Sequence, residues 1–138
     1  MGIEGIYLLD AARYDQRAFP EFRVDPRIGE AQPLDPRWER VGPLARLDMG
    51  HVIYWRGPRM AGAASPWSAR CHQNRGPANE PDGWRCKAGY LLTPHIALVY
   101  DFVTPGDDFV PAALSVEARV SRIARSLLGD EGTVPRRQ

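Results

Sequence analysis

The chain has 138 residues, a length typical of one domain. Hydrophobic residues make up 43% of it and charged residues 25%, which are proportions typical of globular rather than disordered proteins. Eighteen basic and seventeen acidic residues give a formal net charge of +1, which argues against binding to DNA or an acidic membrane through bulk charge. No apolar stretch approaches the roughly 18 residues of a membrane helix, and the first residues lack the pattern of a secretory signal. We therefore expect a single-domain soluble protein, cytoplasmic or in a virus particle, with no membrane insertion.

The composition is arginine-rich, because Lys87 is the only lysine among the eighteen basic residues. Arginine suits protein interfaces, although its even spread along the chain also fits a compositional bias of the genome. Thirteen prolines and thirteen glycines predict many loops and short elements.

The N-terminal part is expected to contain one strand, one short helix and an extended arm. Residues 3–9 are typical of a strand, and Asp10 can cap a helix over 11–18 that Pro20 ends. Prolines at four positions between 20 and 36 exclude a long helix or a central strand, so residues 20–43 are predicted as an extended arm. Its apolar residues follow no period, and we expect them at an interface: Phe19, Phe22, Ile28, Leu34 and Trp38.

The middle of the chain, residues 44–103, is expected to form the sheet. Before it, Asp35 and Pro36 predict a short turn of helix over 36–40. Four runs rich in β-branched and aromatic residues predict strands at 51–55, 67–73, 84–92 and 95–103. The last run is almost entirely apolar, which favours a central position, but the strand order does not follow from the sequence.

The C-terminal part is expected to be a helix over 111–129 followed by a polar tail, residues 130–138. One apolar stripe with helical spacing supports this helix: Val116, Val120, Ile123, Ala124 and Leu127. Glu117 near its start suits the helix dipole. The predicted fold class is therefore α+β, a small and mainly antiparallel sheet with a C-terminal amphipathic helix and a Pro-rich N-terminal arm.

The two cysteines, Cys71 and Cys86, fall nearly opposite each other if the strands at 67–73 and 84–92 form a hairpin. A disulfide there would close a loop of about 15 residues and could add about 3 kcal/mol to stability. Two buried free thiols that pack as small apolar residues are the interpretation that the sequence favours.

A zinc site is a weaker alternative for the same residues. Cys71, Cys86 and His95, with His72, offer two sulfurs and two nitrogens, but no Cys-x-x-Cys or His-x3–5-His spacing is present. We expect no metal and no cofactor.

A cysteine–histidine nucleophilic site is a second alternative, with Cys71 or Cys86 activated by His51 or His95 and the base oriented by Asp101. The strings at 50–57 and 94–101, Gly-His-Val-Ile-Tyr-Trp-Arg-Gly and Pro-His-Ile-Ala-Leu-Val-Tyr-Asp, each resemble the histidine strand of the NlpC/P60 cysteine peptidases. That resemblance implies a cysteine in an Asp-Cys-Ser-Gly-like string before the histidine, and no cysteine precedes His51. The sequence is therefore not assigned to the family.

Arg119, Arg122 and Arg125 repeat every three residues beside the apolar stripe and are the best local candidates for phosphate contact. Aromatic stacking would have to come from the four tryptophans, which are expected in the core or at an interface first. Nucleic acid is therefore a less favoured partner than other protein chains.

The leading functional hypothesis is a non-enzymatic subunit docked in a larger multi-subunit assembly, with an accessory protein of a phage head, neck or tail as its specific version. The Pro-rich arm, the aromatic residues and the arginines favour it, because these residue types are enriched at interfaces. A small Cys–His hydrolase or transferase and a small protein-binding regulator or inhibitor are the alternatives. Whether the protein is an enzyme stays open, with the balance toward no activity.

Overall fold

The computed structural model describes residues 2–14, 37–74, 83–105 and 108–129. Most of the predicted arm and the polar tail lie outside the described residues. So do four of the five residues expected at an interface, Phe19, Phe22, Ile28 and Leu34.

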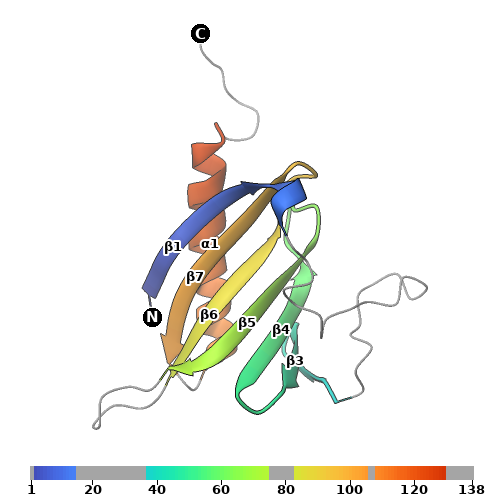
Figure 1. The fold of residues 1–138 in the computed structure, drawn as a ribbon, viewed down its shortest axis with the longest axis vertical. Helices are drawn as coiled ribbons and strands as arrows, with labels where there is room; N and C mark the ends of the chain where they lie inside the picture. Colours follow the sequence, from blue (N-terminus) through green and yellow to red (C-terminus); the bar gives the residue numbers. More distant parts are fainter. Residues whose placement is uncertain (1, 15–36, 75–82, 106–107, 130–138) are drawn as a thin grey trace, which may run out of the picture.

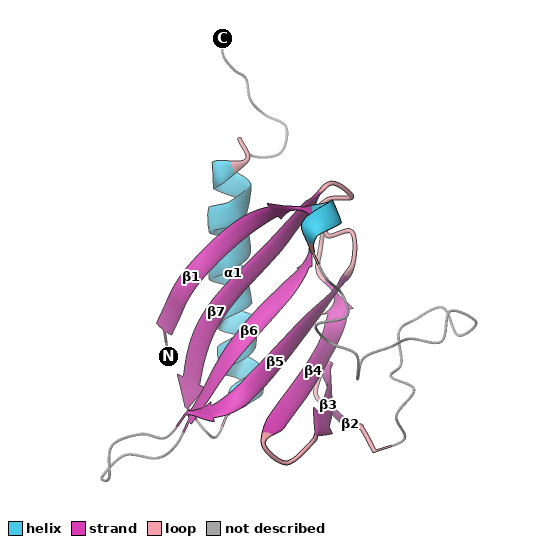
Figure 2. Ribbon diagram, viewed as in Figure 1, coloured by secondary structure: helices cyan, strands magenta, loops and turns pink. Residues whose placement is uncertain are grey.

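The described residues form one seven-stranded antiparallel sheet with a long helix across one face (Figures 1 and 2). The strand order is β1-β7-β6-β5-β4-β3-β2, so that β2 to β7 follow the chain and β1 pairs with β7. The elements are β1 (Gly2–Asp10), the 3-10 helix η1 (Ala11–Arg13), β2 (Glu39–Val41), β3 (Leu44–Asp48), β4 (Val52–Arg59), β5 (Pro66–Asn74), β6 (Gly83–Leu91), β7 (Ile96–Pro105) and α1 (Phe109–Leu127).

The α+β class with a mostly antiparallel sheet and one C-terminal helix is confirmed. The strand predicted at residues 3–9 is present as β1, but it belongs to the same sheet, which therefore extends beyond residues 44–103. The sheet is also larger than expected, because β2 and β3 are strands that the sequence did not predict. Asp10 caps the first turn as expected, since its Oδ1 accepts a 2.9 Å hydrogen bond from the backbone N–H of Ala12. The helix predicted over 11–18 is wrong in its length, because η1 ends at Arg13 and Tyr14 is extended, and residues 15–18 lie outside the described residues.

The predicted turn of helix at 36–40 is wrong at its end, where Glu39 begins strand β2. The reason is the hairpin that follows, in which Val41 pairs with Leu44 across the two-residue turn Gly42–Pro43. Gly42 has a φ of 60°, a conformation that favours glycine and that two-residue hairpin turns require. Strand pairing thus overrides the local helix signals of Asp35 and Pro36.

The main core lies between the sheet and α1. Trp67, Tyr90, Tyr100 and Phe102 are fully buried on the sheet side. They pack with one stripe of α1 side chains: Phe109, Ala113, Val116, Val120 and Ala124. Ile123 and Leu127 were expected in this stripe, but they are 43% and 69% exposed. Ile123 therefore lies beside the buried stripe rather than in it, because its neighbour Ala124 is fully buried, and Leu127 is the last residue of α1, whose C-terminal end extends past the strands in Figure 1.

The opposite face of the sheet carries a smaller cluster of Leu47, Val52 and Tyr54. Trp38, the one described member of the expected interface set, packs against this cluster and is half-buried. The Trp38 side chain therefore packs against residues of its own chain.

Candidate functional site

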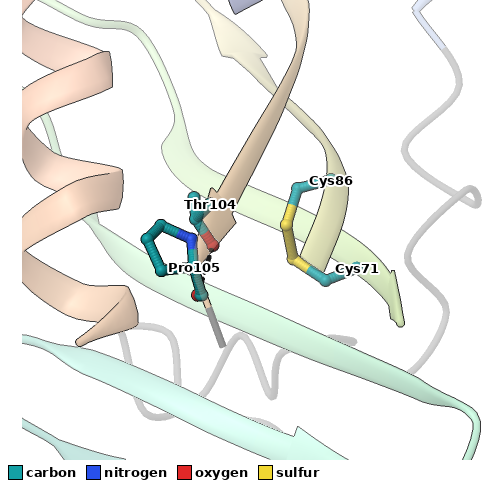
Figure 3. Close-up of a disulfide and its surroundings, with 4 residues drawn as sticks. All are labelled: Cys71, Cys86, Thr104 and Pro105. Atoms are coloured by element: carbon teal, nitrogen blue, oxygen red, sulfur yellow. Dashed lines mark hydrogen bonds between the residues drawn. A yellow bond between two sulfur atoms is a disulfide. The ribbon is translucent and has the colours of Figure 1, made fainter. Parts of the chain in front are cut away.

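Cys71 and Cys86 are joined by a disulfide, drawn in Figure 3, so the free thiols favoured from the sequence are wrong and the disulfide interpretation holds. The two residues face each other directly in the β5–β6 register, and their Cα atoms are 4.1 Å apart. Both side chains are buried in the core between the sheet and α1. Thr104 and Pro105, at the end of β7, are drawn beside the disulfide in Figure 3, so the bridge lies at that end of the sheet.

This arrangement does not support the Cys–His nucleophile. A nucleophilic cysteine needs a free thiol that a base can deprotonate, and neither sulfur carries one in the disulfide. The candidate bases His51 and His95 are both exposed, whereas the sulfurs are in the core. The arrangement that the alternative requires is therefore not formed.

The other members of the proposed cysteine site also lie apart. Cys86 pairs with Phe102, and His95 precedes β7 by one residue, so about 20 Å of strand separates the two positions. Asp101 alternates with the buried Tyr100 and Phe102 and therefore points to the sheet face away from the helix. Among the described residues, no group of three His, Cys, Asp or Glu side chains could hold a metal ion.

The three arginines of α1, predicted as candidates for phosphate contact, differ in their surroundings. Arg119 and Arg122 are exposed, but the Arg125 guanidinium donates a 2.9 Å hydrogen bond to the backbone oxygen of Ala61. Trp55 and Trp67 are buried in the core, which leaves their rings unavailable for base stacking.

A buried carboxylate under α1 is the main polar feature that the sequence analysis missed. Glu117 is 5% exposed, and its two oxygens accept 2.6 Å hydrogen bonds from the hydroxyls of Tyr90 and Tyr100. Trp67 donates its indole N–H to the Tyr100 oxygen at 2.7 Å. Because all four side chains are buried, a solute in water cannot reach them, and the network is a structural feature of this conformation.

Burial dominates the titration of this network. It raises the pKa of Glu117 above its usual value of 4.5, and the tyrosine hydrogen bonds and the Arg125 charge only partly oppose it. Burial and the neighbouring carboxylate also raise the pKa values of Tyr90 and Tyr100. Both phenols therefore stay protonated as donors across the physiological range.

A cavity of about 510 Å³ lies where the first turn of α1 meets strands β2, β3 and β4. Its apolar walls include Val41, Ile53, Trp55, Trp84 and Phe109. The rings of Trp55 and Phe109 are stacked with their centroids 4.2 Å apart, which gives the cavity a rigid aromatic wall. This volume is in the range of small-molecule sites.

The polar residues of this cavity are Glu39, Arg46 and Asp108. Arg46 lies 5.8 Å from the centre of the Trp55 ring, 3.5 Å from a Glu39 oxygen and 3.1 Å from an Asp48 oxygen. Asp108 precedes α1 with a left-handed φ of 62° and makes no side-chain capping hydrogen bond.

Strand β1 forms one end of the sheet, so its outer backbone edge faces no other strand of the described chain. None of its nine residues is fully buried, and Tyr7 is 50% exposed. Its two charged residues lie near its ends, where Glu4 pairs with Arg85 at a bulge and Asp10 caps η1. Residues 5–9 carry no charge.

In the described part of the chain, α1 and the other helical segment fall short of the length and apolarity needed to cross a bilayer. No protein-family model matches the sequence, and no match was found among curated proteins or solved structures.

Proposed function

We propose that this protein is a non-enzymatic subunit that docks into a larger assembly by pairing strand β1 with a strand of another protein chain. The observation that carries the proposal is the uncharged, partly exposed run of residues 5–9 in β1, one of the two end strands of the described sheet. Other protein chains were also the partners expected from the sequence.

An open edge has a physical cost that a partner strand removes. Its outward N–H and C=O groups are templates for another strand, and natural edges are usually blocked by charges, prolines or bulges. In β1 the bulge lies between Ile3 and Gly5, so residues 5–9 have no such block. A partner strand would also cover Ile6 and Leu8, which are only partly buried against the core.

A charge at the edge tests the proposal. We expect Tyr7→Lys to release the protein from its native assembly, because a lysine on an edge strand is one of the features by which natural sheets block pairing with another strand. Leu127→Lys is the matched control, since Leu127 is also an exposed apolar residue but lies at the end of α1. Particle mass by native mass spectrometry reports the release.

Hydrogen exchange gives an independent readout. We expect the outward amides of residues 5–9 to exchange slowly in the assembly and rapidly in the isolated Tyr7→Lys chain. Release by Leu127→Lys alone, with unchanged exchange in β1, would contradict edge docking and place the contact at the helix end.

The kind of assembly into which the protein docks stays a prediction. A virus particle is the specific assembly that the sequence analysis favoured, and repeated copies of the chain in one particle would support it. A single copy bound to one partner would instead support the regulator or inhibitor alternative. Copy number in the native particle therefore separates the two.

A further inference from the structure

We propose that the cavity beside the start of α1 binds a small organic cation with a flat aromatic body, such as a protonated aromatic amine. This site is independent of the docking edge, because the cavity is lined from β2, β3, β4, β6 and the start of α1, and β1 contributes no residue to it. Three properties of the cavity carry the inference: its size, its aromatic walls and its charge.

The size and walls suit a ring system. A volume of about 510 Å³ accommodates a small molecule, and such sites are mostly apolar with a few placed polar groups. Trp55 and Phe109 are both nearly buried and stacked on each other. Because this wall of the cavity is already ordered, ligand binding does not lose free energy in fixing these two side chains. Trp84 adds a second indole to the lining.

The charge of the cavity favours a cation. The guanidinium of Arg46 is held between the carboxylates of Glu39 and Asp48, so its positive charge is already offset. Asp108 then contributes a further negative charge that the helix cap does not use. The start of α1 carries only about half an elementary positive charge, which offsets part of Asp108 and not all of it.

Aromatic faces add to this preference, because the negative face of an indole ring attracts organic cations. The Trp55 ring is already occupied, because Phe109 is stacked on it and the Arg46 guanidinium lies 5.8 Å from its centre. The half-buried Trp84 is therefore the indole that a ligand cation can contact. A ligand amine near Asp108 would combine a carboxylate contact with an aromatic wall.

Tryptamine, indole and indole-3-acetate are the probes, since they share one ring and differ in charge. We expect isothermal titration calorimetry to show tryptamine binding about tenfold more tightly than indole-3-acetate, with indole between them. Equal affinity for the three probes, stronger binding of indole-3-acetate, or no binding at millimolar concentration would overturn the proposal.

Two variants test the location. Asp108→Asn should weaken tryptamine binding several-fold, and Val110→Trp should abolish it by filling the cavity. Glu4→Gln is the matched control, because it removes an exposed carboxylate on β1, away from the cavity. Circular dichroism checks that each variant is folded, and Asp108 is exposed, so its replacement leaves the core intact. Tryptamine binding by Asp108→Asn and Val110→Trp that equals binding by Glu4→Gln would overturn the site.

Discussion

The Tyr100 hydroxyl donates a 2.6 Å hydrogen bond to Glu117, which links the interior strand β7 to the helix that covers it. Tyr90 makes the equivalent bond from β6 to the other carboxylate oxygen. Trp67 extends the network to β5 through Tyr100. Each carboxylate oxygen thus has one donor, and three adjacent strands are connected to one position on α1.

Removing the Glu117 carboxylate should lower the free energy of unfolding strongly, whereas a side chain that keeps one acceptor oxygen at this position should lower it little. We expect Glu117→Ala to lower the free energy of unfolding by about 3 kcal/mol, because two buried hydroxyls lose their acceptor. Glu117→Gln retains one oxygen and similar shape, and we expect a change of about 1 kcal/mol or less. Urea unfolding followed by circular dichroism measures both, and equal loss in the two variants would contradict this role for the carboxylate.

The network also predicts a pH dependence with a definite sign. Burial raises the pKa of Glu117 in the folded state, so the folded protein binds this proton more tightly than the unfolded chain. The contribution of Glu117 to the free energy of unfolding is therefore highest at acidic pH. It falls as the pH rises from about 4.5 through the higher folded pKa.

Glu117→Gln removes this titration and serves as the reference. We expect the unmodified protein to gain stability relative to Glu117→Gln as the pH is lowered from 7 toward 4. Urea titrations at several pH values measure the difference. A relative loss of stability at acidic pH would show that the folded pKa of Glu117 is lowered, contrary to the effect of burial.

The buried phenol of Tyr14 provides a second pH-dependent prediction. Its ring lies over Gly89, and burial raises its pKa to about 12 while Arg56 opposes the shift. The contribution of Tyr14 to the free energy of unfolding should therefore decline as the pH rises from about 10 through 12. NMR or ultraviolet titration of the protein against a Tyr14→Phe variant should show one phenol that ionises near pH 12. A difference curve centred at 10 would contradict the buried position of Tyr14.

The disulfide should contribute measurably to stability. Its two residues are 15 positions apart, and constraint of a loop of that size is worth about 3 kcal/mol. Urea unfolding with and without a reductant compares the same atoms in both states, so no cavity from a substitution enters the comparison. Two reactive thiols in the denatured, unreduced protein from its native source would contradict the disulfide.

The pairing of β6 with β7 leaves no room for a side chain at Gly83. A Cβ atom there would lie 2.2 Å from the backbone oxygen of Thr104, so one of the strands would have to move. We expect Gly83→Ala to lower the free energy of unfolding by about 2 kcal/mol. Gly2→Ala is the control, because its Cβ would be 3.9 Å from the nearest atom. Similar unfolding midpoints for the two variants would contradict this register.

The sequence predicted the elements whose signals are local. The strands around Val52, Trp67 and Ile96 were found from their β-branched and aromatic residues, and α1 from its apolar spacing. The hairpin at Gly42 was missed, because the helix signals of Asp35 and Pro36 are local while the pairing of β2 with β3 depends on tertiary contacts.

The candidate sites depend on contacts between distant segments, which a single sequence does not display. From the sequence, Glu117 was interpreted only as a residue that suits the helix dipole, and its burial under α1 was not predicted. Its partners lie 27 and 17 residues away in the chain. The cavity likewise needs Val41 of β2 and Phe109 of α1 to meet.

The mass of the native particle that contains this chain tests the docking proposal most directly. We would purify the protein from its source and measure the particle by native mass spectrometry, with Tyr7→Lys beside it. Our account predicts a particle well above the 15.5 kDa of one chain that Tyr7→Lys disrupts. A 15.5 kDa monomer for the unmodified protein, or a particle that Tyr7→Lys leaves intact, would contradict it.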